Sequence, residues 1–415
     1  MIVKTNLIYL VGTLVNAGIP FMLMPILTRH LSASAYGSMN LLVTLYALAI
    51  PIISINLASY IYRVFFENGT ISRELFKTCL GVVVRWALII GTIAFMTTIF
   101  LSLTFDFPMK YAFTSIAIVF SAFSHLVYLT FLNMLSAANK PYSFVKLQLL
   151  YTITIFSVSL LFIIPLNFGY LGRLYGLLFT DFLFAIVVSF ILGKYLSDGS
   201  ERKSKTEIKR DFLVYGFGFL PHAISAILLS SVDKLVIATK INLEQLGYYA
   251  VALQFTSILM IFTQGISKEW SRSFLAAPYR QGIYLTGSIY ISSILLLALL
   301  LYYSQGLFYS VFVGDGFGVQ PSLIAVLIVS YCFHSIYILL SVQLNLSKKT
   351  YLLSGFTVAS VLINIGVSLV LVESMGLLGV AVGTAMGMLC KLIFASIYVI
   401  VARKSYILRQ KDLNL

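Results

Sequence analysis

The sequence predicts an all-α membrane protein with twelve transmembrane helices, arranged as two repeat-related six-helix lobes around a central cavity. Hydrophobic residues make up 60% of the 415-residue chain and charged residues only 10%, which excludes a soluble globular protein. Apolar runs of about 20 residues, the length that a helix needs to cross a bilayer, recur along the whole chain. Sequence patterns in the first half of the chain also return in the second half.

The apolar runs fall into two sets of six. They cover residues 6–28, 38–62, 79–103, 111–137, 143–166 and 170–195, then 211–238, 245–270, 282–304, 321–346, 351–372 and 376–402. The alternation that is typical of barrel strands is absent from these runs. We therefore expect a first lobe at 1–196, a cytoplasmic linker at 197–210, a second lobe at 211–402 and a cytoplasmic tail at 403–415.

Repeated residues support the division into two halves. Three glycines that open the last span of the first half recur 207 residues later. They are Gly169, Gly172 and Gly176, and their counterparts are Gly376, Gly379 and Gly383. Further repeat-related pairs are Gly37 with Gly247, His125 with His334, and Tyr128 with Tyr337. A duplicated helical bundle is the usual build of a transporter, whose substrate site lies where the repeats face each other.

The basic residues predict the orientation in the membrane. With the N-terminus inside, 21 of the 28 Lys and Arg residues fall in cytoplasmic segments and only five on the other side. An even number of spans then places both termini in the cytoplasm. The net charge of +14 is accounted for mainly by this bias, so we expect no nucleic-acid partner.

Helix-breaking residues occur at matching places in the two halves. The first and seventh spans both contain them: Gly18, Pro20 and Pro25, then Gly216, Gly218 and Pro221. Proline removes a backbone donor and bends a helix, so these residues are candidate hinges for alternating access. The alternative is that proline and glycine are common in membrane helices without such a role.

Several ionisable residues lie within the predicted spans. They are Arg85, His125, Asp181, His222, His334 and Lys391. A charge at the bilayer centre costs about 2.5–3.5 kcal/mol on insertion scales, so each needs a cavity or a partner. His125 and His334 each have a tyrosine three residues later on the same helical face. A helix-to-helix hydrogen bond and a proton relay both remain open for these histidines.

Other kinds of chemistry receive no support from the sequence. Cys79, Cys332 and Cys390 are scattered through apolar runs, which predicts neither a disulfide framework nor a metal site. No phosphate-binding G-x-x-x-x-G-K-[ST] loop is present, which argues against direct use of ATP. We therefore expect no catalytic residues and no cofactor.

Two segments resemble a known family. The stretch YGFGFLPHAISAILLSSVDKLVIATKINLEQLGYYAVALQF at 215–255 has a proline-bearing helix, then Asp233 followed by Lys234, then a Gly-Tyr pair opening the next span. SYIYRVFFEN at 59–68 has an arginine, an aromatic pair and a glutamate. With twelve spans and the repeat, the chain resembles Wzx-type O-antigen flippases of the multidrug/oligosaccharidyl-lipid/polysaccharide (MOP) exporter superfamily. KEWSRSF at 268–274 departs from the pattern, because relatives often place a proline soon after the tryptophan.

The resemblance implies transport of undecaprenyl-pyrophosphate-linked oligosaccharide from the cytoplasmic to the periplasmic leaflet of a bacterial inner membrane. Basic residues lining the cavity would offset the pyrophosphate or acidic sugars. The candidates on the facing walls are Arg29, Arg63, Lys234, Lys268 and Arg272, followed by Arg85 and Lys391. Asp181, Asp233, His125 and His334 are the candidates for coupling transport to a proton or sodium gradient.

The same pathway implies an O-antigen polymerase and a chain-length regulator as partners. Two other functions remain open. A multidrug antiporter of the same superfamily would share the spans but would favour a more acidic or apolar cavity. A polymerase or ligase would carry a large periplasmic catalytic loop, whereas the loops predicted on that side are short and their acids, Asp106, Asp315 and Glu373, are scattered.

Overall fold

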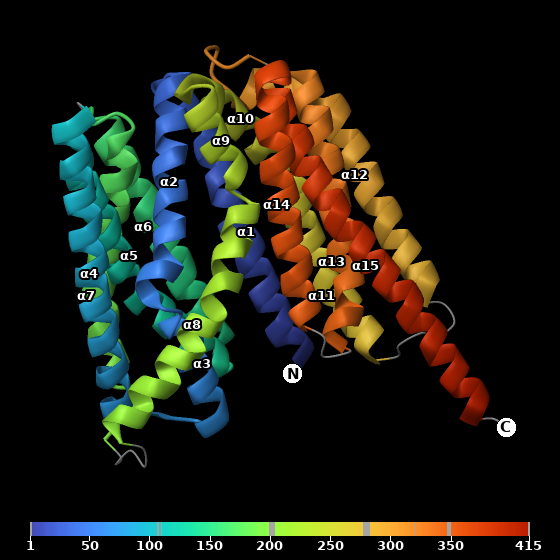
Figure 1. Ribbon diagram of the computed structural model, residues 1–415, viewed down its shortest axis with the longest axis horizontal. Helices are drawn as coiled ribbons and strands as arrows, with labels where there is room; N and C mark the ends of the chain where they lie inside the picture. The colour runs from blue at the N-terminus through green and yellow to red at the C-terminus, as the bar shows by residue number, and fades with distance from the viewer. Residues whose placement is uncertain are drawn as a thin grey trace. The chain divides into compact units, whose positions relative to one another are not determined.

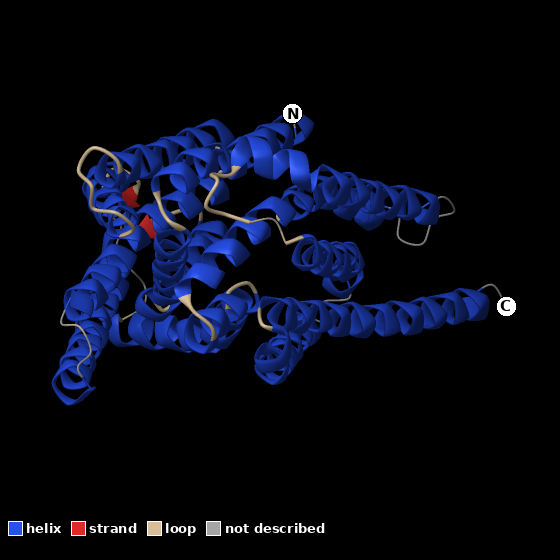
Figure 2. Ribbon diagram, turned by 90° about the horizontal axis from the view of Figure 1, so that it is seen from above, coloured by secondary structure: helices blue, strands red, loops and turns tan. Residues whose placement is uncertain are grey.

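The computed structural model describes residues 2–105, 108, 110–198, 204–276, 283–318, 320–346 and 350–413. This part of the chain is helical apart from loops and two short strands (Figures 1 and 2). The elements are α1 (Ile2–His30), α2 (Ala33–Ser54), α3 (Leu57–Asn68), β1 (Ile71–Ser72), α4 (Arg73–Phe105), α5 (Lys110–Ala137), α6 (Pro141–Ile163), α7 (Leu171–Leu192), β2 (Leu196–Ser197), α8 (Lys205–Leu229), α9 (Val232–Lys240), α10 (Leu243–Thr256), α11 (Ile258–Ala276), α12 (Ile283–Phe312), α13 (Pro321–Leu346), α14 (Thr350–Met375) and α15 (Leu377–Leu413).

Three of the predicted spans are interrupted, so the described residues form fifteen helices. The second span divides into α2 and α3 at Ile55 and Asn56, which both have positive φ. The seventh divides into α8 and α9, and the eighth into α10 and α11. Within the described residues, eleven helical segments are long and apolar enough to cross a membrane. The first predicted span corresponds to α1, whose first turns are described only in part.

The chain forms two compact units. Unit 1 contains Met1–Ile19 and Leu41–Ile227, and unit 2 contains Pro20–Asn40 and Leu228–Leu415. The chain passes from one unit to the other inside α1, α2 and α8, whereas the sequence placed the division in the 197–210 linker. The end of α1 and the start of α2 therefore belong with the second half of the chain.

Hydrogen bonds attach this N-terminal segment to the rest of unit 2. The Gln254 side chain accepts from the Tyr36 hydroxyl at 2.9 Å and donates to the Pro20 carbonyl oxygen at 2.7 Å. The Gly314 N–H donates to Thr28 Oγ1 at 3.0 Å. These contacts fix the segment at both of its ends.

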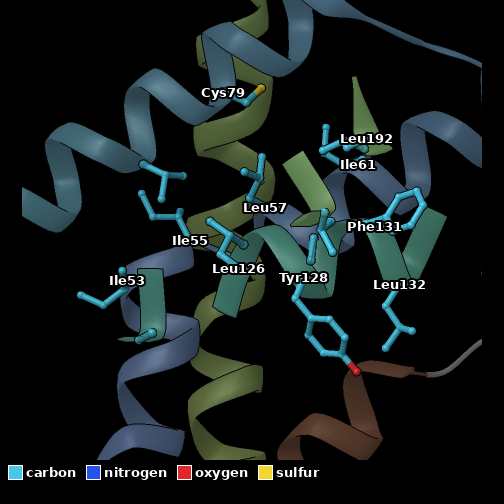
Figure 3. Packing of buried hydrophobic residues seen from close by; sticks show 14 of the residues in the cluster. Ile53, Ile55, Leu57, Ile61, Cys79, Leu126, Tyr128, Phe131, Leu132 and Leu192 are labelled. Carbon is cyan, nitrogen blue, oxygen red and sulfur yellow. The ribbon is translucent and has the colours of Figure 1, made fainter. Parts of the chain in front are cut away.

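Buried aliphatic and aromatic side chains form the core of unit 1. The junction of α2 and α3 contributes Ile53, Ile55 and Leu57, and α5 contributes Leu126 beside them (Figure 3). All four side chains are almost fully buried. The turn between α2 and α3 is thus held in place by apolar packing. The parallel pair of β1 and β2 joins the loops that follow α3 and α7.

The repeated glycines have the same structural role in each unit. Gly169 and Gly376 both have positive φ, a backbone conformation that other residues rarely adopt, just before α7 and α15. A Cβ at Gly176 would overlap Ser159 on α6, and a Cβ at Gly383 would overlap Ser368 on α14. Each pair of helices therefore packs with its backbones in close contact. The repeat predicted from the sequence is present in the local geometry.

A second close approach joins α2 and α10 in unit 2. A Cβ on Gly37 would overlap the carbonyl oxygen of Leu243, and a Cβ on Gly247 would overlap that of Ala33. The two repeat-related glycines thus face one another across one helix crossing. Only glycine permits this separation of the two backbones.

Candidate functional site

The carboxylate of Asp181 is fully buried on α7 and accepts hydrogen bonds from four side chains of unit 1. The hydroxyl groups of Tyr46 and Tyr151 each donate at 2.7 Å. Nδ1 of His125 lies 2.9 Å from Oδ1 and donates in the matching tautomer. The Ser121 hydroxyl donates to Oδ2. A carboxylate has about four acceptor positions, so these four donors fill them.

Four helices bring these groups together. Tyr46 lies on α2, Ser121 and His125 on α5, and Tyr151 on α6. Ser121 and His125 are four residues apart and share a helical face. The close packing of α6 against α7 at Gly176 places Tyr151 beside Asp181. The Asp181 site therefore connects four helices of unit 1, α2, α5, α6 and α7.

Aromatic rings pack beside the Asp181 site. The ring of Tyr128 stacks on that of Tyr151 with centroids 4.2 Å apart and planes inclined by 17°. The ring of His125 lies 5.3 Å from each of these tyrosine rings.

The sequence identified Asp181 and His125 but missed Tyr46, Ser121 and Tyr151. The Ser121–His125 spacing was a usable signal, whereas nothing local identifies the two tyrosines, which come from other helices.

The corresponding place in unit 2 has the opposite charge. The repeat aligns Asp181 with the buried Met388, and Lys391 follows one turn later on α15. Lys391 is only 4% exposed, and its Nζ lies 4.1 Å from the centroid of the Tyr337 ring. Within the described residues, Nδ1 of His334 has no hydrogen-bond partner. The paired histidines therefore have different surroundings, a buried acid in unit 1 and a buried base in unit 2.

A second buried carboxylate lies in unit 2. Asp233 on α9 is 3% exposed and accepts a hydrogen bond of 2.7 Å from the Tyr249 hydroxyl on α10. Its other oxygen accepts from the backbone N–H of Lys234 at 3.0 Å. Asp233 thus links α9 to α10 through the Tyr249 hydroxyl.

The predicted cationic residues occupy different environments. Arg29 is exposed and donates from Nη2 to the Val311 carbonyl oxygen at 3.1 Å in unit 2. Arg85 is exposed on α4 among exposed aliphatic side chains, and Lys234 is half-buried. Lys268 and Arg272 lie on α11, but their side chains fall outside the described residues. Arg29 and Arg85 are therefore accessible to a substrate in this structure, whereas the buried Lys391 is not.

Arg63 lines a groove between α3 and α8 in unit 1. Its Nε donates to Glu67 at 2.8 Å, and its guanidinium carbon lies 5.7 Å from the centroid of the Tyr215 ring. The hydrogen bond with Glu67 raises the pKa of the exposed Arg63 guanidinium, which keeps it charged. One hollow of about 460 Å³ also contains Arg210, and an adjoining one of about 530 Å³ extends to Phe219.

The hinge candidates lie in continuous helices. Pro20 and Pro25 are inside α1, and Pro221 is inside α8. Pro20 is the residue at which the chain enters unit 2, and Gly18 is two residues before it. Gly218 has open space around it, whereas a Cβ at Gly216 would overlap the Ile55 carbonyl oxygen.

The close contact with the Ile55 carbonyl oxygen explains why residue 216 is glycine. The interruption that follows α8 lies at 230–231, nine residues beyond Pro221. A bending role for the six residues stays a prediction.

Comparisons with known proteins assign the family. The model of the family described as "Polysaccharide biosynthesis protein" matches residues 2–269, well over half of the chain. A protein of the Lsg locus of Haemophilus influenzae (strain ATCC 51907 / DSM 11121 / KW20 / Rd) is 26% identical over 285 residues. That alignment spans 64% of this chain and 64% of the relative's length.

Solved structures show the fold. An inward-facing multidrug resistance MATE family transporter of the MOP superfamily aligns with a TM-score of 0.70 and 14% identity, covering 95% of each chain. The lipid II flippase MurJ in an inward closed conformation aligns with a TM-score of 0.68 and 15% identity, covering 95% of this chain and 87% of that one. The predicted all-α, multi-pass MOP-type fold is confirmed. The chain belongs to the polysaccharide biosynthesis protein family and has the fold of the MOP superfamily.

Proposed function

We propose that the protein is a flippase for undecaprenyl-pyrophosphate-linked O-antigen repeat units. It moves them by alternating access from the cytoplasmic to the periplasmic leaflet of the bacterial inner membrane, with both of its termini in the cytoplasm. The match to the polysaccharide biosynthesis family over residues 2–269 is the observation that carries this proposal. The fold shared with a lipid II flippase supports it.

A flippase must bind the polar and charged groups of its substrate, and exposed polar side chains of this chain can bind them. A sugar carries many hydroxyl groups, each of which costs several kcal/mol, about 4–8, in hydrocarbon without a partner. The pyrophosphate adds negative charge, which guanidinium groups bind through paired hydrogen bonds. The exposed Arg63 and Arg29 are the strongest candidates for this contact, followed by Lys234, Lys268, Arg272 and Arg85.

The Asp181 site is the proposed coupling site for a proton or sodium gradient. Its acceptor positions are filled by four donors, so protonation of the carboxylate requires at least one donor to leave or to reverse its hydrogen bond. Tyr46, Tyr151 and Ser121 attach α2, α6 and α5 to α7. Binding of the ion would therefore change the contacts between helices of unit 1.

A clean deletion in the native host tests the flippase. We expect loss of all O-antigen on lipopolysaccharide gels, including the single-unit band, together with repeat units trapped on the cytoplasmic leaflet. If single units still reach the lipid A core while the long ladder disappears, the protein acts after flipping, as a polymerase would. Normal lipopolysaccharide together with increased drug sensitivity would replace the proposal with a multidrug antiporter.

A further inference from the structure

The groove between α3 and α8 has aromatic rings on both of its walls. On α8, the rings of Tyr215 and Phe219 stack with centroids 6.2 Å apart and planes inclined by 6°. On α3, Tyr62 and Phe66 stack at 6.4 Å and 10°. The residues of each pair are four positions apart, so each pair places two nearly parallel rings on one side of its helix. Phe66 is 72% exposed, and Tyr62 and Phe219 are 39% exposed each.

Polar groups accompany these rings. Ser59 and Asn133 line the hollow that contains the two ring pairs, together with Arg63 and Glu67. The adjoining hollow shares Arg63, Glu67 and Tyr215 and adds Arg210 and Asp211. Donors and acceptors for hydrogen bonds therefore lie next to aromatic rings in both hollows.

The charges in the groove are balanced. Two arginines, Arg63 and Arg210, stand beside two acids, Glu67 and Asp211. A polyprenyl or acyl tail would favour a groove without charges, and an acidic sugar would favour an excess of positive charge. An uncharged sugar ring matches both the aromatic rings and the balanced polar groups of the groove. Its C–H face can stack on the rings, and its hydroxyl groups need hydrogen-bond donors and acceptors.

We propose that this groove binds the uncharged sugar ring that is attached directly to the pyrophosphate of the lipid-linked substrate. Tyr215 and Phe219 form the stacking face, Tyr62 and Phe66 cover the opposite side, and Glu67 and Asn133 bind hydroxyl groups. Arg63, which lines both hollows, lies where the sugar meets the pyrophosphate. This inference rests on the proposed flippase function and adds that unit 1 alone reads the first sugar.

Binding measurements on the full-length protein in lipid nanodiscs test the groove. The probes are the lipid-linked oligosaccharide extracted from the deletion host and bare undecaprenyl pyrophosphate. We expect the wild type to bind the glycosylated lipid about tenfold more tightly, and the double variant Tyr215→Ala/Phe219→Ala to lose this preference while binding the bare lipid as before. Tyr215→Phe keeps the ring and should keep the preference.

Two further variants complete the test. Phe190→Ala removes an aromatic ring that is 75% exposed on α7, outside the groove, and should leave both affinities unchanged. Phe66→Ala removes an exposed ring of the groove and should lower the preference about three- to tenfold. Phe66→Ala therefore tests the groove even if the double variant Tyr215→Ala/Phe219→Ala does not fold.

The outcomes separate this inference from the function on which it rests. Binding of neither lipid, with normal lipopolysaccharide in the deletion strain, would reject the flippase itself. Binding of the glycosylated lipid with an unchanged preference in the groove variants would keep the flippase and reject the sugar site. Equal competition by phosphatidylglycerol at the groove would likewise reject it, and would identify the groove as a phospholipid headgroup site.

Discussion

Asp181 on α7 accepts a hydrogen bond of 2.7 Å from the Tyr46 hydroxyl on α2. The contact joins residues 135 positions apart, and it is one of four that surround the same buried carboxylate. Two of the four donors, Ser121 and His125, have counterparts of the same type, Ser330 and His334, 209 residues later in unit 2. The acid that contacts His125 is present in one repeat only, because Asp181 aligns with Met388 in unit 2. Replacement of Asp181 is therefore the most direct test of a role in coupling transport to an ion gradient.

We predict that Asp181→Asn abolishes O-antigen export while the protein still accumulates in the membrane. The amide keeps the size of the side chain but cannot release a proton or carry the charge that binds a cation. Lipopolysaccharide gels and immunoblots of the membrane fraction measure the two quantities, with about a tenfold or larger loss of ladder expected for a step that needs the charge. Asp315→Asn, which changes an exposed acid, is the matched control and should export normally. Normal export by Asp181→Asn would show that this acid is structural.

Tyr46→Phe and Tyr151→Phe should each destabilise unit 1. Each substitution removes one donor to the buried carboxylate and leaves the ring in place, and a hydrogen bond to a charged group contributes about 1.5–3 kcal/mol. The free energy of unfolding in detergent, or the corresponding midpoint temperature, measures the loss. Because the two tyrosines share one acceptor, the double variant should lose less than the sum of the singles. Strict additivity would indicate that the two hydrogen bonds act independently.

Local sequence signals explain which parts of the fold were predictable. Long apolar runs gave the spans, and the repeated glycines Gly169 and Gly376 stand just before α7 and α15, where the sequence placed the start of the last span of each half. Helix α8 begins at Lys205, six residues before the apolar run that the sequence shows from 211. A usable signal was present, because Ser204 and Glu207 form reciprocal hydrogen bonds across the first turn of α8, the pattern of a capping box.

Other features depend on contacts between distant segments. The break after Ser54 involves isoleucine and asparagine with positive φ, where neither proline nor glycine marks an interruption. The turn is kept by packing against Gly216, 160 residues later, whose carbonyl oxygen accepts from the Asn56 side chain at 3.4 Å. The groove and the Asp181 donors likewise come from separate helices. No single window of sequence contains them.

Gly37→Ala and Gly247→Ala should destabilise the crossing of α2 and α10. In each case the added methyl group would overlap a backbone carbonyl oxygen, which cannot rotate away as a side chain can. We expect a loss of about 1–3 kcal/mol or more in the free energy of unfolding, measured by thermal or denaturant unfolding in detergent. Gly355→Ala is the control within α14, where the methyl group would meet nothing within 4 Å. It should be neutral or stabilise by up to about 1 kcal/mol. Equal behaviour of all three variants would refute the close approach.

Lys391→Met and Arg63→Gln should have opposite consequences for transport. Lys391 is buried against the Tyr337 ring, so an apolar side chain of similar length can replace it with little loss of stability and without altering an exposed contact. Arg63 is exposed beside Glu67 and Tyr215, where it can reach a pyrophosphate. Export measured by the O-antigen ladder should therefore stay near normal for Lys391→Met and fall about tenfold or more for Arg63→Gln. The reverse result would move the anion-binding role to the buried lysine, and it would mean that a side chain closed off in this structure becomes accessible during transport.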